Sequence, residues 1–335
     1  MNESITNTSN IPEVLERPSL FHGDELIYRC REINDTVADA PSDDSPSLND
    51  DSEQRSITET KRHKEGYEGK KPLWWKRLSG RRATKGQRAC LERMKAQGYL
   101  IASLPQYGEF VDLKKLFIAS PGAENKRLHI KERELILEVG FGDGKNLFAN
   151  ARRNSKRLYL GADVHQGGVC SLLKQIEHHN QHSKSLLTNI KLYAGDGVKL
   201  IRYLPPASVS QIMLTFPDPW PNKHQEKFRI IQLEVINDME RILVNDGLVL
   251  LATDSKSFAE WSEQVFACSK QWVTCDPPSR EQWLPEVSKY ELEAINASRE
   301  TILRCWRLNQ KENFGGAEAN PHPLGAKNRQ SNRNP

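Results

Sequence analysis

The chain carries the segment Leu-Glu-Val-Gly-Phe-Gly-Asp-Gly at residues 137–144, between an apolar run and a stretch with helical spacing. Its three glycines let the backbone pass close under a ligand and supply positive φ angles where a side chain would clash. A glycine-rich loop that joins a strand to a helix is typical of ligand binding at the carboxyl end of a parallel strand. We therefore expect a ligand site at this segment.

Outward from this segment, short apolar runs alternate with longer amphipathic ones, which is typical of a parallel sheet wrapped by helices. The predicted strands are Leu135–Val139, Leu158–Ala162, Ile190–Ala194, Gln211–Phe216 and Leu248–Thr253. The predicted helices are Asn146–Arg153, Gly167–His179, Val198–Tyr203, Glu226–Val244 and Phe258–Ser269. Val287–Ile295 and Thr301–Leu308 predict a C-terminal antiparallel hairpin. The sequence thus predicts an α/β, doubly wound, Rossmann-like fold with a mostly parallel sheet.

The composition divides the 335-residue chain into four parts. Residues 1–65 are polar and acidic with few large apolar side chains, so we expect an extension that stays disordered. Residues 66–133 form a basic N-terminal segment that leads into the α/β domain at residues 134–310. The Asn-, Pro- and Arg-rich residues 311–335 predict a disordered tail. Although the net charge of the chain is only +4, this basic N-terminal segment is suited to binding a polyanion.

Cysteine spacing and hydropathy bear on the compartment. The six cysteines form no Cys-x-x-Cys pair and no secretory hydrophobic region precedes them, which favours the cytoplasm. No apolar run approaches the roughly 18 to 20 residues of a membrane span, so we expect no membrane association. His178, His179 and His182 lack a partner at ligand spacing, which favours a solvated helix face over a metal site. The sequence leaves a monomer and a homodimer open.

Three acidic residues lie at or directly after the carboxyl ends of successive predicted strands. Glu138 lies in the glycine-rich segment, Asp163 follows the second strand, and Asp196 stands between two glycines after the third. A carboxylate at the tip of the second strand can accept hydrogen bonds from both ribose hydroxyls, and one at the third can accept from an adenine amino group. A dinucleotide fingerprint would place glycine where Lys145 stands. The pattern therefore favours S-adenosylmethionine, which has no pyrophosphate, over a nicotinamide dinucleotide.

The fourth predicted strand ends in Phe-Pro-Asp-Pro-Trp-Pro at residues 216–221. Prolines on both sides of Asp218 fix the backbone and aim its carboxylate into the crevice beside the cofactor. Trp220 offers a flat face for a base. A plain stiff turn is the alternative interpretation, but its place at the end of the fourth strand favours a catalytic role for Asp218.

These motifs together resemble the bacterial tRNA (guanine-N7)-methyltransferases, a family of class I S-adenosylmethionine-dependent methyltransferases. The similarity spans about residues 77 to 308. The segments that carry it are Arg81–Gln87, Glu138–Gly144, His165 with Gly167–Val169, Phe216–Trp220, Ala252–Asp254 and Ser288–Glu291.

The resemblance implies an enzyme that transfers a methyl group from S-adenosylmethionine to N7 of guanine 46 in the variable loop of tRNA. Asp218 would be the catalytic carboxylate. The implied cofactor-binding residues are Glu138, Gly140, Gly142, Asp163, Asp196 and Asp218. The implied substrate-binding residues are Asn222, Lys223, Asp254, Ser288 and Glu291.

Several positions depart from the family's pattern. Asp163 stands where the family usually has Glu, and Ser288 stands where it has Thr, so both keep the functional group. The basic block after Trp220 begins with Asn222 in place of Lys, and residues 224–226 and 228 are not basic. Fewer cations predict weaker binding of phosphate groups.

Three alternatives stay open. The thinned basic block favours a methyltransferase that acts on another RNA or a small molecule. A nicotinamide-dependent oxidoreductase is disfavoured by Lys145 and by the lack of a Tyr/Lys or His catalytic pair. An RNA-binding module without catalysis is disfavoured by the presence of Asp218.

Overall fold

The computed structural model describes residues 84–106, 108–118 and 133–309. The disorder predicted for residues 1–65 and 311–335 lies outside the described residues, as do Arg81 and Arg82. Within the described ranges, no helix combines the length and the hydropathy that a transmembrane span requires.

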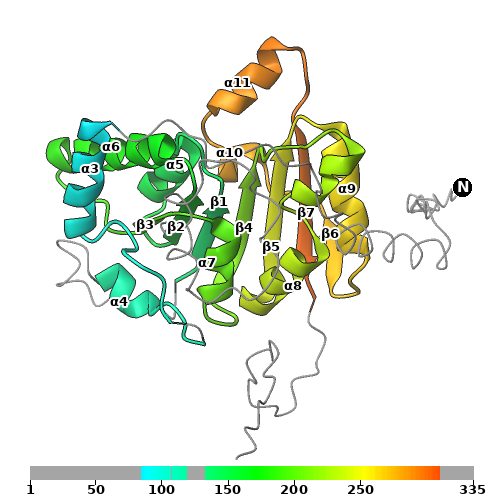
Figure 1. The fold of residues 1–335 in the computed structure, drawn as a ribbon, viewed down its shortest axis with the longest axis horizontal. Helices are drawn as coiled ribbons and strands as arrows, with labels where there is room; N and C mark the ends of the chain where they lie inside the picture. Colours follow the sequence, from blue (N-terminus) through cyan, green and yellow to red (C-terminus); the bar gives the residue numbers. More distant parts are fainter. Residues whose placement is uncertain (1–83, 107, 119–132, 310–335) are drawn as a thin grey trace, which may run out of the picture. The chain divides into compact units, whose positions relative to one another are not determined.

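A seven-stranded sheet organises this part of the chain, with the strand order β3-β2-β1-β4-β5-β7-β6 (Figure 1). Strands β1 to β5 run parallel to their neighbours in that group, whereas β7 pairs antiparallel with both β5 and β6. The strands are β1 (Leu135–Val139), β2 (Leu158–Asp163), β3 (Ile190–Ala194), β4 (Val209–Thr215), β5 (Leu243–Thr253), β6 (Trp272–Cys275) and β7 (Ile302–Leu308). This order confirms the predicted doubly wound, mostly parallel architecture, with its topological switch point between β1 and β4.

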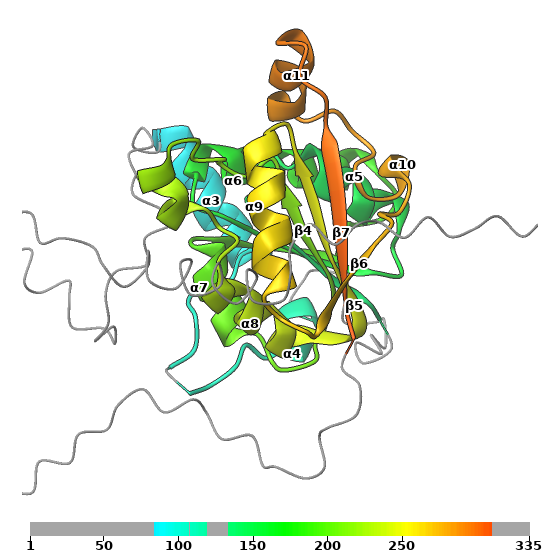
Figure 2. The same ribbon diagram turned by 90° about the vertical axis from the view of Figure 1, so that its right-hand side faces the viewer.

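Helices cover both faces of this sheet. α8 and α9 lie on one side of it, and α5 and α10 lie on the other (Figure 2). The helices are α3 (Lys85–Ala96), α4 (Leu113–Ile118), α5 (Lys145–Arg153), α6 (Gln166–His182), α7 (Gly197–Tyr203), the 3-10 helix η2 (Lys223–Phe228), α8 (Leu233–Ile242), α9 (Lys256–Ala267), α10 (Arg280–Trp283) and α11 (Lys289–Asn296). Every residue of β1 and β2 is buried, as parallel strands covered on both faces require.

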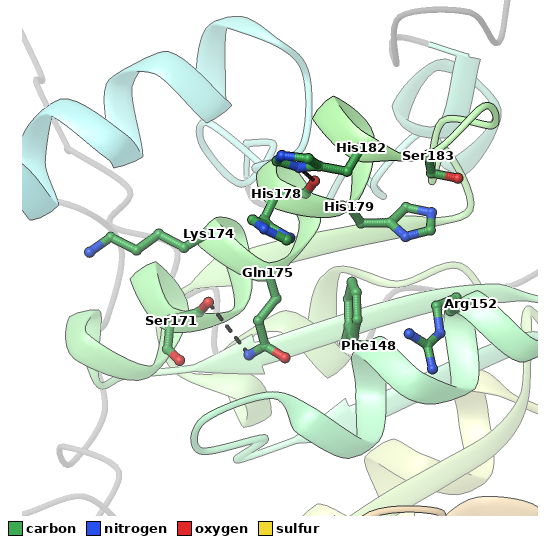
Figure 3. Close-up of a pocket in the computed structure, with 9 residues that line it drawn as sticks. All are labelled: Phe148, Arg152, Ser171, Lys174, Gln175, His178, His179, His182 and Ser183. Carbon is green, nitrogen blue, oxygen red and sulfur yellow. Dashed lines mark hydrogen bonds between the residues drawn. The ribbon is translucent and has the colours of Figure 1, made fainter.

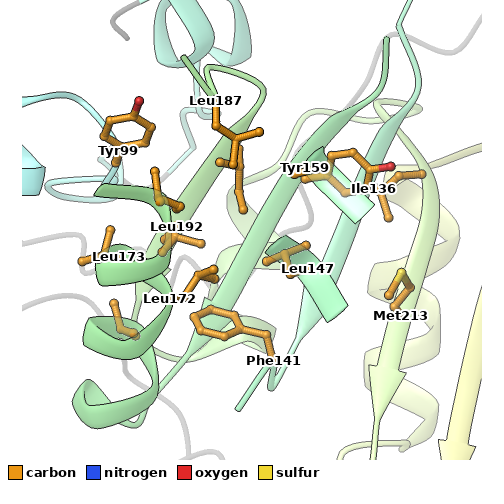
Figure 4. Close-up of a cluster of buried hydrophobic side chains, with 14 of the residues drawn as sticks. Tyr99, Ile136, Phe141, Leu147, Tyr159, Leu172, Leu173, Leu187, Leu192 and Met213 are labelled. Carbon is orange, nitrogen blue, oxygen red and sulfur yellow. The ribbon is translucent and has the colours of Figure 1, made fainter. Parts of the chain in front are cut away.

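An apolar cluster lies between the sheet and helices α5 and α6 (Figure 4). Leu147 of α5 and Leu172 of α6 pack there with Phe141, Tyr159 and Leu192. Burial of each such side chain contributes about 1.5–3 kcal/mol. Because Phe141 belongs both to this cluster and to the glycine-rich segment, the cluster fixes that segment in place.

The described part of the basic N-terminal segment packs on α6 and on the edge strand β3. Thr84 caps α3 by accepting a hydrogen bond from the backbone of the helix's third residue (3.2 Å). The Nε of Arg93 donates to Oε1 of Glu177 on α6 (2.6 Å). Leu100 forms a β-bridge with Leu192 of β3. Helix α3 therefore belongs to the same folded unit as the sheet.

The predicted C-terminal hairpin is right in its second strand and wrong in its first. Strand β7 lies where it was expected, but residues 289–296 form helix α11 and the true partner strand is β6. Ser288 caps α11 by accepting a hydrogen bond from the backbone N of Glu291 (3.1 Å). The Ser-x-x-Glu pattern is a helix-start signal, which the neighbouring apolar residues obscured.

The predicted helix Glu226–Val244 is also wrong in part. The chain forms η2, breaks at residues 229–232, resumes as α8 at Leu233 and enters β5 at Leu243. At the break, Nε2 of Gln232 donates to the carbonyl oxygens of Glu226 (2.8 Å) and Arg229 (3.1 Å). A side chain that satisfies these carbonyl groups ends the helical hydrogen-bond ladder.

Candidate active site

The glycine-rich loop connects β1 to α5. Gly140, Gly142 and Gly144 have φ angles of 77°, 60° and 76°, which residues with a Cβ rarely adopt. A Cβ on Gly144 would lie 2.7 Å from the Cβ of Leu172 on α6. The loop therefore needs glycine both for its backbone conformation and for its close packing on α6.

Glu138 lies within β1, directly before this loop, and is only 1% exposed. Its Oε1 accepts a hydrogen bond from Oγ1 of Thr215 at the end of β4 (2.8 Å), and its Oε2 has no partner among the described residues. Burial raises the pKa of Glu138 to about 7. A buried acceptor without a donor costs about 1–3 kcal/mol, so this oxygen fits a ligand that supplies a donor.

Asp163 ends β2 and braces the glycine-rich loop. Its Oδ2 accepts from the backbone N of Gly142 (2.8 Å) and its Oδ1 accepts from the backbone N of His165 (2.7 Å). Burial raises the pKa of Asp163, and these two hydrogen bonds oppose the shift. The N-cap of α6 is His165, so Asp163 is not a helix cap. A carboxylate has about four lone-pair sites, and both oxygens can therefore still accept from ribose hydroxyls.

Asp196 follows β3 and is the N-cap of α7. Its Oδ1 accepts from the backbone N of Val198 (2.9 Å) and of Lys199 (3.4 Å). Because β3, β2 and β1 are parallel neighbours in the sheet, Asp196 lies at the same end of the strands, the carboxyl end, as Asp163 and Glu138. The structure thus brings the three predicted acids and the glycine-rich loop to one edge.

Residues Phe216–Pro221, the Asp218 loop, follow β4 on the other side of β1. Phe216 and Trp220 have φ angles of 49° and 43°, and each non-glycine residue in this region costs on the order of 1–3 kcal/mol. The backbone N of Phe216 donates to the carbonyl oxygen of Ala252 on β5 (2.7 Å). Asp218 itself is exposed. The loop therefore presents an exposed carboxylate from a strained and anchored backbone.

Helix α11 projects beyond the edge of the sheet, and its start contacts the glycine-rich loop (Figure 1). A cavity of about 10 Å³ is lined by Gly140–Asp143, Thr215 and Ser288–Tyr290. The Cε2 of Tyr290 lies 3.5 Å from the position that a Cβ on Gly142 would take. Burial, and then the charges of Asp218 and Asp163, raise the pKa of Tyr290. The ring of Tyr290 therefore lies beside the glycine-rich loop.

Glu291, on the first turn of α11, is 3% exposed. Its Oε1 accepts from Nη2 (2.6 Å) and Nε (3.2 Å) of Arg280, and its Oε2 has no partner among the described residues. The hydroxyl of Ser288 is used as the helix cap. In this structure both residues stabilise the start of α11. Oε2 of Glu291 can still accept a hydrogen bond from a ligand.

Asp254, Asn222 and Lys223 lie in more open positions. Asp254 follows β5, and its Oδ2 accepts from Nε of Arg299 (2.7 Å). Asn222 and Lys223 begin η2 and are exposed, with Nδ2 of Asn222 donating to Oε1 of Gln225 (3.0 Å). These side chains are accessible to a large ligand that approaches the sheet edge.

Sequence reasoning gave no role to Thr215, Tyr290 or Arg280. Thr215 directly precedes the Asp218 loop, and Tyr290 lies inside the Ser-x-x-Glu motif, so both were close to residues already singled out. Arg280 offered no such signal, because its partner Glu291 comes to it only when α10 and α11 pack together.

A larger hollow of about 600 Å³ lies between α5 and α6, away from these residues (Figure 3). Its lining combines three histidines with two cations and an aromatic ring, and contains none of the predicted site residues. The lining residues are Phe148, Arg152, Ser171, Lys174, Gln175, His178, His179, His182 and Ser183. In the described ranges, no three His, Cys, Asp or Glu side chains are grouped as a metal site.

Comparisons with known proteins bear on this site. A family model described as a putative methyltransferase matches residues 132–303. The tRNA (guanine-N(7)-)-methyltransferase of Halorhodospira halophila is 34% identical over 198 residues, covering 58% of this chain and 77% of that protein. The enzyme of the same name from Bartonella quintana is 35% identical over 136 residues, covering 41% of this chain and 57% of that protein. The chain thus spans most of the first relative and little more than half of the second.

A solved structure described as the 16S rRNA methyltransferase KamB is also similar. The match has a TM-score of 0.39 and 17% sequence identity, and it covers 56% of this chain and 94% of that one.

Proposed function

The chain belongs to the tRNA (guanine-N7)-methyltransferase family, and we propose on this basis that it transfers a methyl group from S-adenosylmethionine to N7 of a guanine in tRNA. We propose guanine 46 of the variable loop as the target and the cytoplasm as the compartment. The observation that carries the proposal is the juxtaposition, at the carboxyl ends of the parallel strands, of a glycine-rich loop, a buried carboxylate oxygen that has no partner in the described part of the chain, and the strained Asp218 loop.

The cofactor would be held by the residues at the ends of β1, β2 and β3. Oε2 of Glu138, which has no partner within the described ranges, would accept from a cationic amino group, and Asp163 would offer lone pairs to ribose hydroxyls. Gly140 and Gly142 let the backbone approach the ligand closely. Asp196 would accept a hydrogen bond from the adenine amino group of the cofactor. S-Adenosylmethionine supplies an electrophilic methyl group on a sulfonium.

The reaction requires little acid–base catalysis by the protein. Guanine N7 carries an in-plane lone pair at neutral pH, so no proton has to leave before it attacks. The protein must align the reacting atoms and stabilise the positive charge that develops on the purine. Asp218 is exposed on a loop with a strained backbone, so its carboxylate suits this electrostatic role, and it would also border the cofactor.

The target nucleotide would be held by the residues opposite the cofactor. The second oxygen of Glu291 and the carboxylate of Asp254 can accept from the N1–H and the exocyclic amine of guanine. Ser288 can contribute its hydroxyl. Asn222 and Lys223 are exposed at the start of η2, where they can meet the phosphate backbone.

One observation favours a second candidate, a methyltransferase that acts on another RNA. Of the three cations at the basic block after Trp220, Arg229 is only 2% exposed and its Nη1 donates to Oε1 of Glu226 (3.3 Å). Only Lys223 and Lys227 then remain for phosphate groups, so contacts with RNA are fewer than in the family's pattern.

Nucleoside mass spectrometry separates the two candidates. The chain is incubated with tRNA that lacks 7-methylguanosine and with isotopically labelled S-adenosylmethionine, and the tRNA is then digested. Labelled 7-methylguanosine is the expected product, and borohydride–aniline cleavage should place it in the variable loop. A different labelled nucleoside would overturn the assigned substrate, and no labelled nucleoside would overturn tRNA methylation.

A further inference from the structure

We infer that Arg229 is a positioning residue, which holds the Asp218 loop in the conformation that methyl transfer needs. The inference rests on the proposed function, because it assigns Arg229 a task in that reaction. Arg229 lies directly after η2 and is 2% exposed. A guanidinium so deeply buried requires partners that justify its burial.

The Asp218 loop cannot hold its own shape. Residues 217, 219 and 221 are prolines, which lack the backbone N–H that turns and helices use. Phe216 and Trp220 lie in the left-handed region of φ without being glycine. Such a conformation persists only where the surrounding structure fixes it. The loop therefore offers several carbonyl acceptors and few donors, and needs a donor from elsewhere in the chain.

Arg229 donates hydrogen bonds to the carbonyl groups of the two residues that follow Asp218. Its Nε donates to the carbonyl oxygen of Pro219 (2.9 Å), and its Nη2 donates to that of Trp220 (3.2 Å). The planar guanidinium thus binds two successive carbonyl groups as a fork, a geometry that lysine cannot reproduce. Because these carbonyls follow Asp218 directly, their position sets the direction of its carboxylate.

Arg229 is in turn held from two sides. Its Nη1 donates to Oε1 of Glu226, and its guanidinium carbon lies 5.1 Å from the ring centroid of Trp261 on α9. Trp261 is fixed because its Nε1 donates to the carbonyl oxygen of Ile231 (2.7 Å). The Asp218 loop is therefore tied through Arg229 to the helix layer that covers the sheet.

Arg241 of α8 provides a matched control. Its guanidinium also captures backbone carbonyl oxygens, those of Leu204 (2.7 Å) and Ile201 (2.8 Å), and lies over an aromatic ring, that of Phe110. Its acceptors lie at the end of α7 and not in the Asp218 loop. Loss of Arg241 should therefore cost stability without disturbing the loop.

The experiment compares full-length chains with Arg229→Met, Arg229→Lys and Arg241→Met. For Arg229→Met we expect kcat for tRNA methylation to fall by about 10²-fold, as for a misplacement of about 1 Å, with the KM for S-adenosylmethionine nearly unchanged. Arg229→Lys keeps the charge and should fold, but should still lose most of this factor. Arg241→Met should lower the Tm and leave kcat within about twofold of the wild-type value at a temperature at which it is folded.

A spectroscopic readout tests the loop without relying on activity. The seven tryptophans are labelled as 5-fluorotryptophan, and the ¹⁹F resonance of Trp220 is assigned with Trp220→Phe. Both Arg229 variants should shift or broaden this resonance, and Arg241→Met should not. An unchanged Trp220 resonance together with unchanged kcat in Arg229→Lys would overturn the inference, as would equal losses of kcat in Arg229→Lys and Arg241→Met. A wild-type chain that does not methylate tRNA would refute the proposed function, while the resonance would still report on the loop.

Discussion

At the end of β1, Glu138 combines deep burial with a carboxylate oxygen that has no partner among the described residues. Burial raises its pKa from 4.5 to about 7, so the folded chain retains a proton there that the unfolded chain has lost. Between these two values the folded state binds more protons than the unfolded state. The free energy of unfolding of the ligand-free chain should therefore fall as the pH rises through this window.

The same carboxylate should make cofactor binding depend on pH. Only the ionised form pairs with the ammonium group of S-adenosylmethionine, so calorimetry should show Kd falling by up to about tenfold per pH unit as the pH rises toward 7. Glu138→Gln cannot ionise, and should bind more weakly with little dependence on pH. The same pH dependence in both chains would assign the titration to another group.

Asp218 is exposed, and its role should be chemical rather than structural. Asp218→Asn keeps the shape of the side chain and removes the charge. If the carboxylate stabilises positive charge on the purine, the single-turnover rate should fall by about 10²–10³-fold. The Tm should change little, because surface substitutions usually alter stability by less than about 0.5 kcal/mol. Turnover near the wild-type rate would exclude the proposed electrostatic role.

Among the elements, the contact between α6 and the glycine-rich loop offers a matched pair of substitutions in adjacent residues. A Cβ on Gly168 would lie 2.0 Å from the carbonyl oxygen of Gly142, whereas a Cβ on Gly167 would meet nothing closer than a side-chain nitrogen at 3.9 Å. Gly168→Ala must therefore push the loop away from α6. We expect it to weaken S-adenosylmethionine binding by at least about tenfold, or roughly 1.4 kcal/mol, and to lower the Tm.

Gly167→Ala is the control for this substitution. Alanine inside a helix is favoured over glycine by about 0.5–1 kcal/mol, so the Tm should hold or rise and binding should be unchanged. Calorimetry and thermal melts on the two chains check the prediction. Equal affinity in both would show that the loop does not depend on its close approach to α6.

The sequence pattern predicted the elements whose apolar residues are buried in the way that the pattern implies. β1 and β3 lie at the predicted residues because they are apolar runs bounded by turn residues. α11 was missed because it projects beyond the sheet, with Leu292 and Ile295 about half exposed, so its apolar residues do not mark a buried face. η2 and α8 were merged because the break depends on side-chain hydrogen bonds to backbone carbonyl groups, those of Arg229 to Pro219 and of Gln232 to Glu226, which the apolar spacing does not show.

The candidate site divides in the same way. The strand-end acids could be predicted, because parallel strands bring their carboxyl ends to one edge. The hydrogen-bond partners of the acidic site residues could not be predicted, because Thr215 meets Glu138 and Arg280 meets Glu291 only through tertiary packing. The positive φ angles of Phe216 and Trp220 were also beyond prediction, since neither residue favours that region.

For the whole molecule, a tRNA is far larger than the site, and the basic segment before the sheet should supply contacts beyond it. Lys85 is exposed at the start of α3, and Arg81 and Arg82 precede it outside the described residues. Neutralising all three should weaken tRNA binding and flatten its dependence on log salt, by up to roughly one unit for each phosphate group that the variant no longer binds.

Three exposed lysines outside that segment, Lys156, Lys184 and Lys270, give a control with the same loss of charge. Their neutralisation should leave the salt slope nearly unchanged. Filter binding across a range of salt concentrations measures both sets. Equal slopes in the two triple variants would mean that the segment before the sheet makes no particular contact with tRNA.

One substitution in the substrate tests directly whether this chain methylates N7 of a guanine in tRNA. A tRNA is assembled with either guanosine or 7-deazaguanosine at the variable-loop target, and the transfer of labelled methyl from S-adenosylmethionine is counted. 7-Deazaguanosine keeps the Watson–Crick edge but has carbon in place of N7, so it has no lone pair there to attack the methyl group. We predict methylation of the guanosine tRNA at about one methyl per molecule and none of the 7-deazaguanosine tRNA. Equal incorporation into both tRNAs would contradict the assignment of N7 as the acceptor.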